Sequence, residues 1–242
     1  MMRLDFIYLT LAAYALFFLY PAQATAEIII HGTRVIYHSD AREVTLQLMN
    51  NGDQPALVQV WMDRGDASVR PELAQVPFAI TPPMTRVEGG RGQALRITAL
   101  ANSQHLSSDQ ETLFWLNILD IPPKPQRNAS EAQNYLQLAI RSRIKFIYRP
   151  KRVHGNVVDA ASKMQWQYQD HQLMVSNPTP FFISVTSVEQ SISGQKINLI
   201  EEGMLLAPYS KNNINLKSDN LNNMKFVLIN DYGNRIEKEI KF

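Results

Sequence analysis

Short runs rich in β-branched and aromatic residues recur along the chain, and this recurrence is the strongest constraint on its fold. Successive runs begin about 8 to 15 residues apart and are separated by Gly, Pro, Asn and Asp. The clearest runs are residues 27–37, 44–49, 56–63, 94–99, 113–119, 135–148, 181–188 and 224–230. No long segment has the periodicity of a helix. Strands at this spacing predict an all-β chain built from sandwiches or barrels.

The first 26 residues have the pattern of a secretory signal peptide. Arg3 precedes an apolar run over residues 6–20, and Pro21 and the small residues 24–26 follow it. A run of this length is shorter than the roughly 20 residues that span a bilayer, which argues against a membrane anchor. We therefore expect export, cleavage before Glu27 and no membrane insertion of the mature chain.

The composition limits how such an exported chain can be stabilised. It contains no cysteine, so strand pairing and burial must hold the fold together without disulfides. The net charge is +2 and charged residues make up 19% of the chain, an ordinary balance for a globular protein. Overall charge therefore indicates neither a nucleic-acid coat nor an acidic tail.

A domain boundary is predicted near Pro150. This proline ends a long apolar run, because it cannot donate to a strand ladder, and the polar residues 151–156 follow. We expect a signal peptide at residues 1–26, a first sandwich at residues 27–150 and a second at residues 151–242.

Residues 135–148 form an unusually long run without glycine, proline or any acidic residue. A strand usually has about 5–6 residues, so part of this one is expected to project or to lie at a sheet edge. Leu136, Leu138 and Ile140 lie on one face of it, and periodicity alone favours a core position for all three. The alternative, an exposed apolar edge, would invite pairing with another chain.

Several motifs resemble those of the periplasmic chaperones of the chaperone–usher pathway, which assemble pili. Two of them are ETLFWLNILDIPPKP at residues 111–125 and, about 20 residues further on, IKFIYRP at residues 144–150. The others are GTRVIY at residues 32–37, FAITPP at residues 78–83, NPTPFF at residues 177–182 and INDYG at residues 229–233. The resemblance covers nearly all of residues 27–242.

The resemblance implies two immunoglobulin-like β-sandwich domains set at an angle, with a cleft between them. Pilus subunits lack a final strand, and the chaperone is expected to lend Leu136, Leu138 and Ile140 to the exposed groove of a subunit. The resemblance also implies that Arg34 and Lys145 bind the C-terminal carboxylate of the subunit.

Further roles follow from the same resemblance. Glu111, Arg149 and Asp231 match positions of an interdomain ion-pair network with a structural role. The segment between Asp120 and Tyr135 is short, which is typical of the chaperones of rod-like pili. The family is periplasmic, needs no cofactor or metal, delivers subunits to an outer-membrane usher and includes members that mask the free strand by forming homodimers.

An enzyme is the first alternative, and the sequence offers little for it. The five histidines lack metal-ligand spacing, and nucleophile-elbow, P-loop and dinucleotide motifs are absent. Gly89-Gly90-Arg91-Gly92 lies between two predicted strands and indicates a hairpin turn. A Ser-His-Asp set assembled across the fold stays open at this stage. We expect a protein that is not an enzyme.

The second alternative is a surface that binds polyanions or membranes. Six cations fall within twelve residues: Arg141, Arg143, Lys145, Arg149, Lys151 and Arg152. Such a cluster can bind phosphates. Few aromatic residues interleave with these cations, and an exported chain seldom meets nucleic acid. We therefore favour a solvated basic face beside the cleft for Arg141, Arg143 and Arg152.

Overall fold

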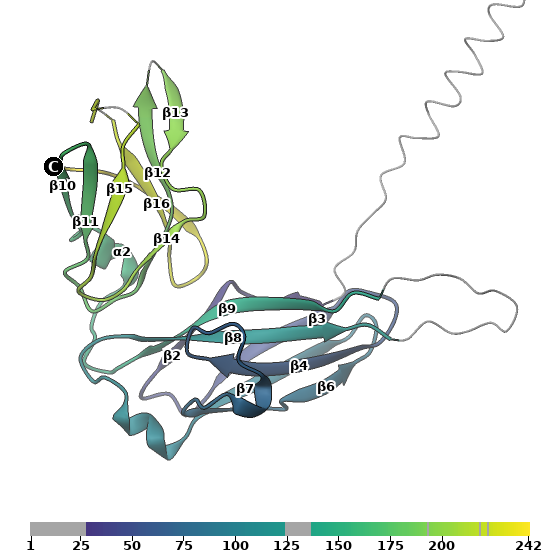
Figure 1. Ribbon diagram of the computed structural model, residues 1–242. Coiled ribbons are helices and arrows are strands. Elements are labelled where there is room, and N and C mark those ends of the chain that lie inside the picture. Colours follow the sequence, from purple (N-terminus) through teal and green to yellow (C-terminus); the bar gives the residue numbers. More distant parts are fainter. Residues whose placement is uncertain (1–27, 124–136, 193, 218, 222) are drawn as a thin grey trace, which may run out of the picture.

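The computed structural model describes residues 28–123, 137–192, 194–217, 219–221 and 223–242. The expected signal peptide at residues 1–26 and the predicted donor residue Leu136 lie outside these ranges. The described chain consists mainly of strands arranged as two sandwiches set at an angle (Figure 1). The predicted all-β fold is confirmed.

The first sandwich is built from two sheets. One sheet has the order β1 (Ile28–Ile30), β3 (Val44–Asn50), β7 (Gly92–Ala99) and β5 (Phe78–Thr81). The other has the order β2 (Arg34–His38), β9 (Ile140–Arg149), β8 (Thr112–Ile121), β4 (Ala56–Asp63) and β6 (Met84–Val87). Two short 3-10 helices, η1 (Pro71–Leu73) and η2 (Ala101–His105), lie in the connections.

The core of the first sandwich follows from the alternation of its strands. Phe114, Leu116 and Ile118 of β8 are completely or almost completely buried, while the residues between them turn to the other face. Phe146 of β9 contacts Phe78 edge-to-face, with ring centroids 4.8 Å apart. Aromatic contacts of this kind stabilise a core beyond the area that they bury.

The second sandwich begins after the polar connection that follows Arg149. A short helix, α2 (Val157–Ala161), opens it, and the Asn156 side chain accepts hydrogen bonds from the first N–H groups of this helix. One sheet has the order β10 (Gln165–Gln169), β11 (Gln172–Ser176) and β15 (Lys211–Asn215). The other has the order β13 (Gln195–Asn198), β12 (Ile183–Ile192), β16 (Lys225–Ile229) and β17 (Arg235–Glu239), with β14 (Met204–Leu206) also paired to β12.

The prediction of one strand over residues 135–148 is wrong in its described part. Strand β9 begins only at Ile140, and Gln137, Leu138 and Ala139 belong to no strand. The reason lies in the neighbouring strand: β8 ends at Ile121, and two prolines follow it, so residues before Ile140 have no ladder partner there. The side chain of Gln137 instead donates to the carbonyl oxygen of Pro122 over 2.7 Å.

Candidate functional site

Strand β9 has one open edge. It pairs with β8 over all but its last residue, from Asp120 opposite Ile140 to Thr112 opposite Tyr148. On its other side the parallel pairing with β2 covers only Lys145–Arg149. From Ile140 to Ile144, no described strand pairs with that side of β9. An unpaired edge is a template for the addition of a strand from another chain.

Apolar side chains stand beside this open edge. Leu138 is 62% exposed and Ile140 is 56% exposed, so the expectation from periodicity that they belong to the core is wrong. Further along the same face, Ile144 packs against the core and Phe146 is fully buried. The apolar face of β9 therefore continues from the core into solvent as the strand leaves the sandwich.

A cleft of about 500 Å³ lies where the two sandwiches meet. Arg34, Trp115 and Lys145 line it from the first sandwich. The second sandwich contributes residues 184–186 of β12, residues 201–205 before and within β14, and Ile229 of β16. Arg34 and Lys145 are direct partners in the parallel register of β2 and β9, so the fold brings the two predicted anchor cations together.

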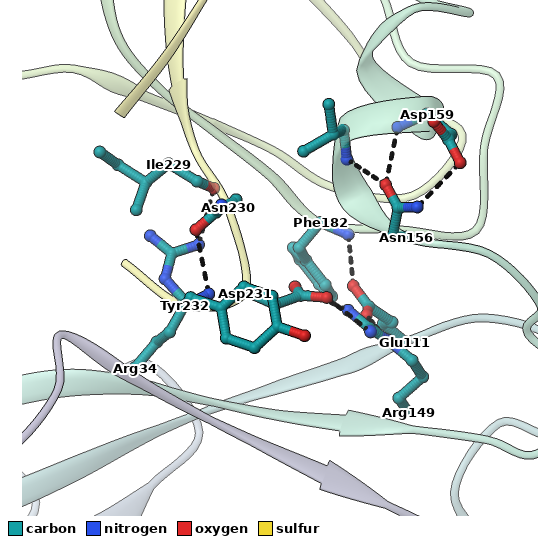
Figure 2. Close-up of polar contacts among 11 residues, drawn as sticks. Arg34, Glu111, Arg149, Asn156, Asp159, Phe182, Ile229, Asn230, Asp231 and Tyr232 are labelled. Carbon is teal, nitrogen blue, oxygen red and sulfur yellow. Dashed lines mark hydrogen bonds and ion pairs between the residues drawn. The ribbon is translucent and has the colours of Figure 1, made fainter. Parts of the chain in front are cut away.

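Arg34 spans the junction between the two sandwiches. Its Nη1 donates to the carbonyl oxygen of Ile229 over 3.1 Å (Figure 2). Its Nε is buried and has no hydrogen-bond partner in the described part of the chain. Burial lowers the pKa of the Arg34 guanidinium, although the carboxylates of Asp231 and Glu111 oppose this. One donor of this side chain is thus buried without an acceptor.

Lys145 carries an uncompensated positive charge. Burial lowers the pKa of its ammonium, and the neighbouring charge of Arg34 lowers it further. It contacts an aromatic ring, with Nζ 5.2 Å from the centroid of Trp115. No described carboxylate lies within ion-pair distance of it. Two adjacent, partly desolvated cations can attract an anion, because charge-assisted hydrogen bonds are the stronger ones, although Glu201 and Glu202 also line the cleft.

Arg149 is compensated twice, in contrast to the two cleft cations. Its Nε donates to Glu111 over 2.6 Å, and its two terminal nitrogens donate to the carboxylate of Asp231 over 2.8 and 2.9 Å (Figure 2). Glu111 also accepts the backbone N–H of Phe182 over 2.7 Å. The three predicted network residues are therefore in direct contact, and the contacts join the two sandwiches.

The environment of this network is largely dry. The side chains of Arg149 and Glu111 are 6% and 1% exposed. Burial raises the pKa of the Glu111 carboxyl, and the positive charge of Arg149 and the N–H of Phe182 oppose that rise. Burial alone would lower the pKa of the Arg149 guanidinium, but its hydrogen bonds to Asp231 and the negative charge of Glu111 outweigh burial and raise it. Asn230 orders the adjoining turn by accepting the N–H groups of Tyr232 and Asn234.

The basic face of β9 is largely engaged within the first sandwich. Arg141 donates to the carbonyl oxygen of Ala67 over 2.8 Å, and Arg143 makes two hydrogen bonds to the carboxylate of Asp63. These contacts leave fewer free cations for a phosphate-binding surface. The sequence reasoning missed Asp63, because 80 residues separate it from Arg143.

Two further findings concern the described residues only. They contain no group of three or more histidine or acidic side chains placed to hold a metal ion. None of the helices within those ranges is long and apolar enough to cross a membrane.

Family models match nearly the whole chain after residue 26. The N-terminal domain of PapD, a pili and flagellar-assembly chaperone, matches residues 27–154. The C-terminal domain of the pili assembly chaperone PapD matches residues 159–240.

Individual relatives agree with these models. The chain is 43% identical to the chaperone protein MrkB of Klebsiella pneumoniae over 224 residues, which covers 90% of this chain and 94% of the relative. It is 37% identical to the probable fimbrial chaperone YadV of Escherichia coli K12, over 90% of this chain and 91% of the relative.

Solved structures show the same fold. The CupB2 chaperone of Pseudomonas aeruginosa superposes with a TM-score of 0.75 at 37% identity, covering 87% of this chain and 98% of that one. A Salmonella enterica complex of the SafA pilin with the SafB chaperone matches with a TM-score of 0.72 at 28% identity, covering 90% and 99%.

Removal of Arg149 from the network of Glu111, Arg149 and Asp231 is expected to destabilise the protein more than removal of a nearby surface cation does. Arg149→Ala leaves Glu111 buried without its partner, and breaking a buried pair from one side costs about 3–5 kcal/mol. Urea unfolding followed by tryptophan fluorescence measures this loss. Arg152→Ala removes an exposed cation nearby and is expected to change the free energy of unfolding by less than about 0.5 kcal/mol. Equal effects of the two substitutions would contradict a structural role for the network.

Proposed function

The chain belongs to the PapD family of pili assembly chaperones, and we propose that it captures pilus subunits at the open edge of β9 and in the adjacent cleft. The observation that carries this proposal is an unpaired, partly apolar strand edge with two adjacent cations at its inner end that have no ion-pair partner in the described chain. A subunit that lacks a strand needs both backbone partners and apolar side chains. The edge from Ile140 to Ile144 offers the first, and Leu138 with Ile140 offers the second.

Strand addition explains the exposure of the apolar residues. A subunit strand that pairs with Ile140–Ile144 would satisfy the free backbone groups of β9. Leu136, Leu138 and Ile140 would then insert into the groove of the subunit as alternate side chains, and they would cover apolar surface that is prone to aggregation. The solved complex of the SafB chaperone with the SafA pilin, a structural relative, supports this kind of partner.

Arg34 and Lys145 supply the fixed end of the complex. The C-terminal carboxylate of the subunit would bind between them, attracted by the positive charges of Arg34 and Lys145 in the cleft. Anchoring one end matters because a slip of one residue turns every side chain of a strand to the other face. The carboxylate therefore sets the register of Leu136, Leu138 and Ile140 in the groove.

The network of Glu111, Arg149 and Asp231 would keep the cleft in shape. It joins β8 and β9 to the turn after β16 and to the backbone of Phe182, so it can fix the orientation of the two sandwiches. A fixed orientation keeps Ile229 and its neighbours opposite Arg34 and Lys145. The network is thus assigned a structural role.

The cellular setting completes the proposal. The signal peptide at residues 1–26 would direct the chain to the periplasm, where it would deliver bound subunits to an outer-membrane usher. The short connection after Asp120 favours a chaperone of rod-like pili. An empty chaperone would cover its free edge by pairing with a second copy. These steps involve no catalysis, metal or cofactor.

Loss of either cleft cation is expected to abolish subunit capture without unfolding the protein. Truncating one partner of a desolvated charge pair costs about 2–5 kcal/mol, which corresponds to at least about 30-fold weaker binding for Arg34→Ala or Lys145→Ala. The test is co-purification of subunits from periplasm, with bound chains identified by mass. Arg152→Ala is the matched control, and normal subunit recovery with both cleft variants would overturn the anchor assignment.

A charge placed on the exposed apolar edge is expected to weaken capture at constant stability. Leu138→Glu would carry a carboxylate into an apolar groove, while its 62% exposed side chain contributes little to the folded chaperone. Leu73→Glu is the control, because Leu73 is 63% exposed and lies on η1, away from β9. Subunit recovery and the melting temperature are measured together. A large fall in melting temperature for Leu138→Glu alone would place Leu138 in the core.

The affinity for a free carboxylate is expected to fall at alkaline pH. Burial and Arg34 lower the pKa of Lys145 below its ordinary value of 10.5, and a bound carboxylate would raise it again. The complex therefore holds its proton more tightly than the free protein, and binding weakens as the pH rises through the lowered pKa. Titration of the C-terminal peptide of a co-purified subunit at several pH values measures this. Lys145→Arg should remove the dependence below pH 10.5, and an unchanged profile in that variant would contradict the assignment.

A further inference from the structure

We propose that Trp115 is a positioning residue that aims the Lys145 ammonium at the bound carboxylate, with Arg143 and Asp63 holding the indole in place. This inference rests on the proposed function, because it concerns the same cleft. It adds three residues to that site, none of which is expected to bind the carboxylate itself.

Trp115 is placed to hold Lys145. The two residues are direct partners in the antiparallel register of β8 and β9, and both line the cleft. The ammonium lies 5.2 Å from the centroid of the indole ring, within the range of a cation–π contact. A lysine has a long, flexible stem, and fixing it costs conformational entropy at the moment of binding. A contact that already fixes the ammonium in the empty cleft reduces that cost.

An aromatic ring suits this task better than a carboxylate would. A glutamate or aspartate beside Lys145 would neutralise its charge and compete with the carboxylate of the ligand. The face of an indole attracts the ammonium but leaves its charge and its three N–H donors available. Arg34 repels Lys145 from the neighbouring strand, so the ring also opposes a swing of the ammonium out of the cleft.

Arg143 holds the indole ring of Trp115 in place. The Arg143 guanidinium lies 4.4 Å from the ring centroid, closer than Lys145 does. Arg143 is in turn held by Asp63, at 2.5 Å from Nη2 to Oδ1 and 3.3 Å from Nε to Oδ2. A bidentate pair of this kind fixes the plane of the guanidinium as well as its position.

Asp63 is itself held firmly in place, so it can fix the position of Arg143. It is 2% exposed and accepts further hydrogen bonds from the side chain of Asn117 and the N–H of Gly65, both over 2.7 Å. Burial alone would raise the pKa of its carboxyl, but the hydrogen bonds from Arg143, Asn117 and Gly65 outweigh burial and lower it. Asp63 therefore stays charged, and the contacts run from β4 through β9 to the ring on β8.

The test compares two peptides on variants of the full chain. Both carry the last 15 residues of the subunit that co-purifies with the wild-type protein; one ends in a free carboxylate and the other in an amide. The measured quantity is the affinity for the carboxylate peptide divided by the affinity for the amide peptide. We expect Trp115→Leu to lower this ratio by about tenfold and Trp115→Phe to keep most of it, because phenylalanine retains a ring face. Arg143→Gln should give an intermediate loss.

A purely structural role for Trp115 would give a different result, since it would weaken both peptides equally and leave the ratio unchanged. Trp61→Leu is the matched control: Trp61 lies on the same sheet beside Arg141, at 6.0 Å, and outside the cleft. It should lower the melting temperature and leave the ratio as in the wild type. An unchanged ratio in Trp115→Leu overturns this inference alone. A wild-type protein that binds both peptides equally overturns the carboxylate anchor itself.

Discussion

The short parallel pairing between β2 and β9 is the constraint on which the rest of the site depends. It covers five residues of β9 and stops at Lys145, so the outer half of this ten-residue strand keeps an open edge. The same pairing places Arg34 directly beside Lys145 at the point where the edge opens. Had β2 begun five residues earlier, it would have closed the edge and occupied the place of an added strand. One local register thus determines both the open edge and the cation pair.

The cations near the cleft fall into two groups, those in ion pairs with buried carboxylates and those without such a partner. Arg149 and Arg143 are each tied to buried carboxylates, which makes them parts of the framework. Arg34 and Lys145 have no ion-pair partner in the described chain: Arg34 donates to a carbonyl oxygen, and Lys145 contacts an aromatic ring. Partial burial of a charge without an ion-pair partner is unfavourable, and its presence next to an open strand edge supports the proposed anionic ligand. The framework pairs hold the strands in place so that the two uncompensated cations stay adjacent.

The pattern of apolar residues predicts the fold class, whereas most of the candidate site residues were predicted from motifs that resemble those of the family. The alternation in β8 and the buried part of β9 made an all-β sandwich predictable, because both strands place every second side chain in the core. Periodicity failed at Leu138 and Ile140, since it cannot show where the facing sheet ends. The predicted start of β9 is too early, because β9 loses its pairing where two prolines end β8. The local sequence of β9 itself does not show this. The contact of Arg143 with Asp63 joins residues 80 apart, and no local pattern reports such a pair.

An exposed strand edge with apolar neighbours is also a hazard, because any unpaired strand could add to it. The positive charges along β9 limit this hazard. Arg141 lies in the open segment, and Lys145 stands at its inner end, so the edge carries positive charge at the place where a strand would add. A strand that ends in a carboxylate is attracted to the same place. The charges proposed to anchor a ligand would thereby also discriminate among the strands that could reach the edge, while the backbone of the edge stays open to any sequence.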